Sequence, residues 1–420
     1  MPDLNDLVVL ADSLGTDKVL AAEPRCAAVR NRNSSCSRCV DICPTDAITV
    51  EKNHLRVSAS ACVGCGACTT VCPLEALVPI EPSDYQLENA VEQQLQNTPG
   101  RVCFACARMA AREEADPQGY VEVPCLARVD ESLLLSLIAR GITDIRFVDG
   151  TCETCKLNVC GPLVQMVVST ANDLLAAAGS DVRVVRGSAF PEDLLGYVSE
   201  KTYGDERRAF FTDTGNSMKG LLGKAADFFV KNESQKNSMA AAVFGSFGLL
   251  KDGKLSLPDP QRHNRLLDAL WVISEEGRAV PSAEEGALPD DGTAQSGRAG
   301  LSAKGQAVTR YFGTFSYEPG KCRKCGICSR VCPTGALHQS RTKVDGMSRI
   351  TLEYSSSDCV QCHLCEDICF RKCIQVLPMA DLHTLFDFEP QVFLSRAPVS
   401  ANAHTIDGAS APGRHGRATS

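Results

Sequence analysis

Cysteine is the residue type whose number and spacing could do chemistry in this chain. The 420 residues include 23 cysteines, in three groups that span residues 26–72, 103–160 and 322–373. Four cysteines spaced C-x2-C-x2-C-x3-C and followed by proline occur at Cys62–Pro73 and again at Cys322–Pro333. Thiolates are the soft, anionic ligands that a cubane iron site prefers, and these spacings let three of them surround one cluster from a single loop. The pattern predicts iron–sulfur clusters rather than zinc, because zinc modules usually place two cysteine pairs about a dozen or more residues apart.

The third cysteine group resembles a bacterial two-cluster ferredoxin, with its halves at Cys322–Pro333 and Cys359–Cys369. Phe370 stands where that family usually has proline. Cys373 occupies the position that Ala336 holds in the other half, and we expect it to be a buried structural cysteine. The resemblance implies that each cluster takes three thiolates from one half and one from the other. It implies one [4Fe–4S] cluster on Cys322, Cys325, Cys328 and Cys369, and another on Cys359, Cys362, Cys365 and Cys332.

The first cysteine group resembles the same two-cluster motif but lacks one cysteine. Its first half ends in Cys43-Pro44, and alignment on that pair puts Asn33 at the first ligand position. Asparagine is a poor ligand for this iron, and Cys26 is the only nearby thiol that could replace it. The alternative is an incomplete site that holds a three-iron cluster or takes an outside ligand, with Cys26 merely buried. The expected ligand sets are Cys26, Cys36, Cys39 and Cys72 for one cluster, and Cys62, Cys65, Cys68 and Cys43 for the other.

The middle cysteine group lies among predicted strands and helices. Strands are expected at 121–124, 145–148 and 182–185, and helices at 131–140 and 161–178, which favours a small parallel α/β sheet. Loops at the carboxyl ends of parallel strands meet in one crevice, so distant thiols could converge there. A [2Fe–2S] cluster, a structural zinc or a bare redox thiol site would each be possible. The candidate ligands are Cys103, Cys106, Cys125, Cys152 and Cys155.

Residues 101–187 resemble the delta subunit of methyl-viologen-reducing hydrogenases. The likeness rests on the two C-x2-C pairs and on the run Cys125-Leu-Ala-Arg-Val-Asp130. It implies a [2Fe–2S] cluster that passes electrons from a hydrogenase or a formate dehydrogenase to heterodisulfide reductase. The family usually has Gly-Asp-Cys-His near the last ligand, whereas this chain has Glu153-Thr154-Cys155-Lys156, which leaves room for altered ligation. Cys160 is expected to have a structural role on the following helix.

The predicted fold class is a mixed α+β and α/β multidomain protein. It has two ferredoxin-like dicluster domains, a small parallel α/β domain and a helical insert with one apolar face at 218–229 and another at 266–271. The expected boundaries are an N-terminal segment at 1–22, a first ferredoxin-type domain at 23–100, the α/β domain at 101–200, the helical region at 201–280, a flexible linker at 281–308, a second ferredoxin-type domain at 309–390 and a disordered tail at 391–420.

The composition narrows the class of function. The net charge of −8 disfavours a nucleic-acid-binding protein, and the odd, bunched cysteines disfavour a disulfide framework. No secretory signal, no transmembrane run, no nucleotide-binding glycine motif and no hydrolytic triad can be picked out. We expect a cytoplasmic electron-transfer subunit, without a substrate of its own, that relays single electrons between partner oxidoreductases. The alternatives are a reductase that acts on a small substrate such as a disulfide through the middle cysteines, and an interaction protein with structural clusters.

Overall fold

The computed structural model describes residues 18–150, 152–196, 250–251, 254–255, 260–276, 305–344 and 347–396. The helical face expected at 218–229, most of the expected linker and most of the expected tail lie outside these residues, as does the start of the N-terminal segment. All 23 cysteines lie within them, and all are free thiols.

A parallel sheet of four strands forms the middle of the protein, in the order β6-β5-β7-β8. The segment read as a strand at 145–148 is β7, whereas β8 begins two residues later than expected. Residues 101–106, which include Cys103 and Cys106, form the inner strand β5. The sequence pattern did not predict this strand. The strands are β5 (Arg101–Cys106), β6 (Val121–Val123), β7 (Asp144–Val148) and β8 (Val184–Gly187), and the helices are α5 (Asp84–Asn97), α6 (Ala107–Ala110), α7 (Glu131–Ala139) and α8 (Gly161–Ala177).

The two faces of β5 belong to different cores. Val102 and Phe104 are fully buried in the main core, together with apolar residues of α5, α7 and α8. Cys103 and Ala105 point to the other side and pack in a smaller core with Met109. This separation follows from the alternation of side chains along a strand. Because α5 packs against the sheet, this helix belongs to the middle core, although it falls within the segment 23–100.

The N-terminal and C-terminal parts repeat one order of elements, which is strand, helix, hairpin, helix and strand. In each part the first and last strands pair antiparallel, β1 with β4 and β12 with β15. The N-terminal copy contains β1 (Val19–Ala21), α3 (Arg38–Asp41), β2 (Ile48–Glu51), β3 (His54–Val57), α4 (Ala67–Val71) and β4 (Leu77–Pro79), with α2 (Ala27–Arg30) inserted after β1. The C-terminal copy contains β12 (Thr314–Tyr317), α12 (Ile327–Val331), β13 (Leu337–Val344), β14 (Met347–Tyr354), α13 (Leu364–Ile368) and β15 (Ile374–Leu377).

Further short elements complete the C-terminal part and the region before it. Strand β17 extends the hairpin β13–β14 into a three-stranded antiparallel sheet, and β11 pairs with β16. These elements are β11 (Gln306–Val308), β16 (Met379–Asp381), α14 (Leu382–Asp387) and β17 (Gln391–Arg396), preceded by β9 (Leu250–Lys251), β10 (Lys254–Leu255) and α11 (Gln261–Glu276).

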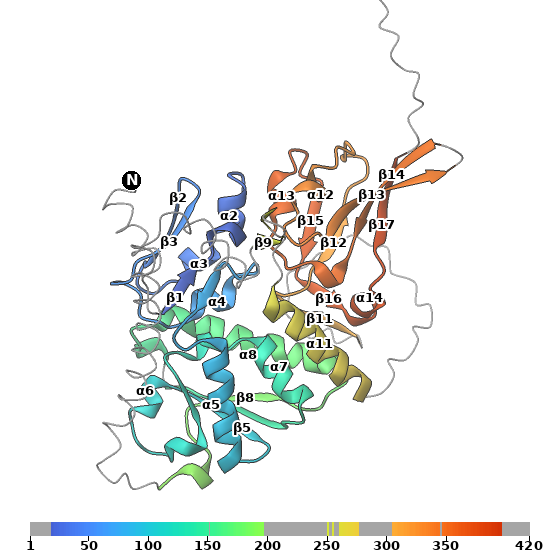
Figure 1. Ribbon diagram of the computed structural model, residues 1–420. Coiled ribbons are helices and arrows are strands. Elements are labelled where there is room, and N and C mark those ends of the chain that lie inside the picture. Colours follow the sequence, from blue (N-terminus) through green and yellow to red (C-terminus); the bar gives the residue numbers. More distant parts are fainter. Residues whose placement is uncertain are drawn as a thin grey trace, which may run out of the picture.

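The N-terminal and C-terminal parts lie next to each other above the parallel sheet, with α11 at the junction (Figure 1). Helix α11 packs against α7 and buries Leu266 and Leu270 in the main core. Trp271 of the same helix meets the ring of Phe386 of α14 edge-on at 5.1 Å. One helix therefore contacts the middle and C-terminal parts at once.

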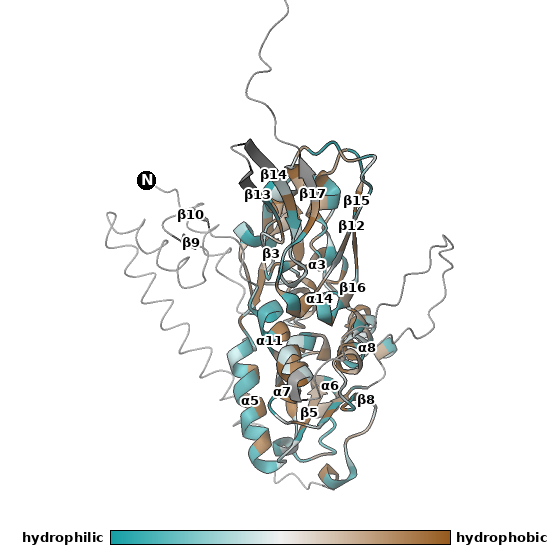
Figure 2. Cartoon of the chain, turned by 90° about the vertical axis from the view of Figure 1, so that its right-hand side faces the viewer, coloured by the Kyte–Doolittle hydropathy of each residue, from teal (hydrophilic) through white to brown (hydrophobic). Residues whose placement is uncertain are grey.

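Hydropathy follows this arrangement. In Figure 2 the helix α5 is largely hydrophilic along its visible length, whereas β5 and α7 beside it are more hydrophobic. Among the described residues, one helical segment, Asn158–Ala177, is long and apolar enough to cross a membrane, and 56 % of its hydrophobic window is buried inside the protein. The buried side of this segment includes Leu163, Val167 and Leu174, which belong to the main core.

Candidate iron–sulfur centres

Three of the four cysteine motifs share one backbone geometry. In the Cys62 motif, the residue before the second cysteine, Gly64, and the residue after it, Gly66, have φ of 72° and 75°. The corresponding residues have the same left-handed conformation in the other two motifs, Lys324 and Gly326 in one, Gln361 and His363 in the other. In the first motif of the chain, Ser37 has φ −127° instead. The motif that lacks a cysteine is therefore also the one whose loop departs from the repeat.

The eight N-terminal thiols fall into two neighbourhoods. The charge of Cys39 interacts with those of Cys26, Cys36 and Cys72, and that of Cys72 with those of Cys26 and Cys36. We call these four thiols site C. The charge of Cys68 interacts with those of Cys43, Cys62 and Cys65, and also with that of Cys39 of site C. We call Cys43, Cys62, Cys65 and Cys68 site B. The ligand sets expected from the sequence stay predictions.

The C-terminal thiols divide in the same way. The charge of Cys365 interacts with those of three thiols, which gives site D, comprising Cys332, Cys359, Cys362 and Cys365. The charge of Cys328 interacts with those of Cys322 and Cys325. These three, with Cys369, form site E. Cys373 lies beside site E, because its Sγ is 3.5 Å from that of Cys369 and it hydrogen-bonds with Cys322.

Four of the five middle cysteines line one cavity at the carboxyl ends of the parallel strands. The cavity is also bordered by Asp149, which follows β7, and by Arg108 and Gly161. We call its thiols site A, which comprises Cys106, Cys125, Cys152 and Cys155. The fifth candidate, Cys103, is fully buried on the opposite face of β5 and does not line this cavity.

Backbone N–H groups donate to several of these sulfurs. The amides of Ala47 and Ala76 lie 3.2 Å from the Sγ atoms of Cys43 and Cys72, four residues before them. Leu157 donates in the same way to Cys155 at 3.4 Å. Hydrogen bonds of this kind stabilise a sulfur that carries negative charge, as a cluster ligand does. The donor set therefore fits iron–sulfur clusters.

Burial changes the acidity of the free thiols. It raises the pKa of Cys72 to about 11 and that of Cys362 to about 12, and together with Asp149 it raises the pKa of Cys152 to about 12. Cys65 is different, because a hydrogen bond with Cys160 lowers its pKa to about 7. Thiols with raised pKa values are protonated near neutral pH, so cluster binding must release their protons.

Sites A and B meet at Cys160. This buried thiol belongs to neither set, yet it hydrogen-bonds with Cys65 of site B and with Cys125 of site A. Close packing holds the junction, because a Cβ on Gly66 would lie 2.4 Å from the Cδ of Arg128. Thr70 adds a hydrogen bond of 2.7 Å from its hydroxyl to the Ala127 carbonyl. Sequence reasoning assigned Cys160 only a structural role, since nothing in its local spacing points to two separate partners.

Sites C and D meet at a small apolar cluster. Ala27, Leu74 and Val360 form it, and Cys36 of site C and Cys362 of site D pack against it. Near this cluster, Arg38 Nη2 donates to the carbonyl of Gln361 at 2.8 Å. Ser35, next to Cys36, donates to Asp367 from both its amide and its hydroxyl.

The remaining junctions lie inside the two repeats. Cys39 of site C and Cys68 of site B interact electrostatically, so these two sites are neighbours. Cys328 of site E is buried in one core with Cys359 and Cys365 of site D. The five sites therefore follow one another in the order A, B, C, D and E.

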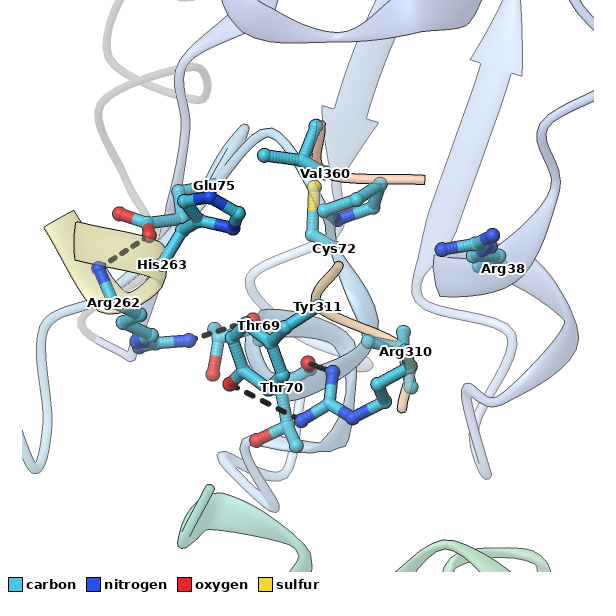
Figure 3. A pocket seen from close by; sticks show the side chains of 12 residues that line it. Arg38, Thr69, Thr70, Cys72, Glu75, Arg262, His263, Arg310, Tyr311 and Val360 are labelled. Atoms are coloured by element: carbon cyan, nitrogen blue, oxygen red, sulfur yellow. Dashed lines mark hydrogen bonds between the residues drawn. The ribbon is translucent and has the colours of Figure 1, made fainter. Parts of the chain in front are cut away.

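A pocket beside Cys72 gathers charged residues from three parts of the chain (Figure 3). Arg262 of α11 donates to the Thr69 carbonyl at 2.7 Å, and Arg310 donates to the Thr70 carbonyl, so both guanidinium groups hold α4 of the N-terminal part. Arg262 also pairs with Asp130 at 3.1 Å. Burial by itself would raise the pKa of Asp130, but Arg262 and Arg265 lower it below its usual range.

Groups of thiols that accept backbone hydrogen bonds are typical of iron–sulfur proteins. Comparison with protein families also indicates iron–sulfur binding. The family model described as an LdpA Fe-S cluster-binding domain matches residues 33–82, and a 4Fe-4S dicluster domain matches residues 321–373. The chain thus has iron–sulfur-binding domains in its N-terminal and C-terminal parts. The first match begins after Cys26, and neither includes the middle cysteines. Comparisons with curated proteins and with solved structures give no match.

The side chains of the described thiols do not converge on a single point in any of the five sites. In the part of the chain that the structure describes, no three His, Cys, Asp or Glu side chains gather tightly enough to hold a single metal ion. The assignment of the ligand sets therefore depends on which thiols share a neighbourhood.

Proposed function

We propose that this protein is an electron carrier in which five iron–sulfur sites form one unbranched relay. The ligand sets are those of sites A to E, with four [4Fe–4S] clusters in sites B to E and a [2Fe–2S] cluster in site A. The observation that supports the relay most is the unbranched sequence of contacts between neighbouring sites. Electrons would enter at one end and leave at the other.

The chain would hold the clusters close together and set their potentials. Thiolates bind the iron, N–H donors stabilise the sulfurs when a cluster gains an electron, and burial opposes that gain of charge. When bound, the clusters supply reversible one-electron chemistry. Cys26 would complete the ligand set of site C, which its place beside Cys36, Cys39 and Cys72 supports.

The partners would be other oxidoreductases. The resemblance of residues 101–187 to the hydrogenase delta subunit points to a hydrogenase, a formate dehydrogenase or a heterodisulfide-reductase-like enzyme, and a reducing cytoplasm would keep the thiols free. In this proposal the protein is a non-catalytic subunit, and the catalytic step belongs to the partner.

Anaerobic purification, with iron, sulfide and zinc measured per chain, tests this function. We expect iron and acid-labile sulfide in equal amounts, no zinc, and paramagnetic resonance signals from several clusters during stepwise reduction. One zinc per chain that remains after Cys62→Ser and Cys322→Ser would instead assign zinc to site A. Clusters that cannot be reduced reversibly by a low-potential donor would contradict the relay.

A second candidate function is a reductase with its active centre at site A. The observation that favours it is the cavity, in which Asp149 Oδ2 lies 3.1 Å from Cys152 Sγ and 2.5 Å from Arg186 Nη2. Turnover of a small disulfide by the purified protein with a chemical reductant would support this function. Absence of turnover in a protein whose clusters are fully reducible would favour the relay.

A further inference from the structure

Site E differs from the other sites in its exposure. Of the 23 cysteines, Cys325 alone is exposed, whereas the thiols of the other four sites are buried or partly buried. Site E is also one end of the order A to E. An electron can enter or leave a relay only where a partner approaches a cluster closely, so this end is where a protein partner could reach the last site.

The surface around Cys325 is basic. Arg323 and Lys324 occupy the loop between the first two cysteines of the site, and Arg371 and Lys372 follow its last ligand, Cys369. The two segments meet, because Cys322 and Cys369 both contact Cys373. We call the exposed side chains of these two segments the basic face, which comprises Arg323, Lys324, Phe370, Arg371 and Lys372.

The charges of the basic face are not neutralised by carboxylates. In the described part of the chain, none of its four cations forms an ion pair, and Lys372 reaches only the carbonyl groups of Glu366 and Asp367, at 3.4 Å. The nearby acids have other partners. Glu318 pairs with Lys321, Glu366 with His363, and Asp367 accepts from Ser35.

This positive region is unusual in a chain of net charge −8. Four cations exceed the small negative charge that four thiolates give an oxidised cubane, so the face attracts anions even with a cluster bound. Phe370, which is 64 % exposed, adds an apolar contact beside the last ligand. An exposed aromatic side chain next to cations in the sequence is consistent with a docking surface.

We propose that the basic face is the docking site for an acidic redox protein that exchanges electrons with site E. Lipid headgroups and nucleic acids are also anionic, but neither exchanges electrons, and the exposed Cys325 directly follows Lys324 of the face. This proposal rests on the relay function. The step transfers one electron from the reduced partner to the oxidised cluster, and no bond is made or broken.

The experiment uses the full-length protein with its clusters and an acidic [2Fe–2S] ferredoxin as the probe. Stopped-flow absorbance follows the rate at which the reduced ferredoxin reduces the oxidised protein. We compare wild type with R323E/R371E and with a control, R112E/R183E, which makes the same charge change on the middle part. Iron and sulfide content establishes that each variant keeps its clusters, and Arg371→Gln serves as a milder variant if R323E/R371E loses one.

We expect the wild-type rate to fall when ionic strength rises from about 0.01 M to about 0.15 M, because the screening length shortens from about 30 Å to about 8 Å. R323E/R371E should lower the rate at low salt by about tenfold or more, and the control should leave it nearly unchanged.

Equal rates in R323E/R371E and wild type, with reducible clusters in both, would overturn the docking site and leave the relay standing. Phosphatidylserine vesicles or duplex DNA that bind wild type but not R323E/R371E, with unchanged ferredoxin rates, would also overturn it. A wild-type protein without reducible clusters would overturn both proposals.

Discussion

Ser35 donates two hydrogen bonds to the carboxylate of Asp367, at 2.7 Å from its amide and 2.8 Å from its hydroxyl, although 332 residues separate them in the sequence. Ser35 directly precedes a ligand of site C, and Asp367 lies on α13 between a ligand of site D and a ligand of site E. The pair is therefore one of the contacts that join the N-terminal and C-terminal iron–sulfur parts, together with Arg38 and Gln361.

Asp367→Ala should loosen the junction between sites C and D. Both hydrogen bonds are exposed, so we expect a loss of about 1 kcal/mol in the free energy of unfolding and no loss of iron. Electron transfer between the N-terminal and C-terminal clusters should slow, as measured by rapid-freeze paramagnetic resonance. Asp41→Ala is the matched control, because within the described residues its carboxylate accepts a hydrogen bond from Ser37, which belongs to the same part of the chain. An equal slowing in both variants would contradict this role of Asp367.

Cys160→Ala should change the potential of a neighbouring cluster without removing it. The hydrogen bond from Cys160 to Cys65 favours the more negative, reduced cluster, so its loss should lower the reduction potential of site B. Potentiometric titration followed by paramagnetic resonance measures the shift. Cys103→Ala is the control, since Cys103 is equally buried but belongs to none of the five sets of thiols and does not line the cavity of site A. Loss of iron in Cys160→Ala would instead make Cys160 a ligand.

Cys26→Ser should remove one cubane or convert it to a three-iron cluster, because site C would keep only three thiolates. Iron and sulfide analysis should show the loss, and a three-iron cluster would give its own signal in the oxidised protein. Cys103→Ser should leave iron and spectra unchanged. If Cys26→Ser also left both unchanged, site C would take its fourth ligand from elsewhere.

Arg262→Met should destabilise the protein strongly. Arg262 is 5 % exposed and pairs with the buried Asp130, whose carboxylate would lose its principal partner. Breaking a buried pair on one side costs about 3–5 kcal/mol, which urea unfolding followed by circular dichroism can measure. Arg140→Met is the control, because Arg140 is exposed and pairs with the exposed Glu92, and we expect a loss of about 1 kcal/mol or less there. A similar loss in the two variants would argue against the importance of burial at Arg262.

Much of the chemistry of sites B to E could be predicted from local spacing. The closely spaced thiols of one motif must lie near each other whatever the rest of the chain does, and the two family matches fall on those segments. The strands and helices between residues 121 and 187 also follow from local apolar patterns, with β8 displaced by two residues. The strand β5 was missed, and with it the reason why Cys103 and Cys106 point to opposite faces.

The tertiary structure decided which sites are neighbours. Contacts such as Ser35 with Asp367, or Cys160 with Cys65, join residues that no spacing rule relates, because they depend on how separately formed parts pack. The same holds for the exposure of Cys325, which depends on what covers each loop after folding. The sequence by itself indicated iron–sulfur-binding motifs in the N-terminal and C-terminal parts, since their cysteine spacing is a short-range feature. The order of the sites and the one exposed end depend on packing between distant segments, which only the folded chain specifies.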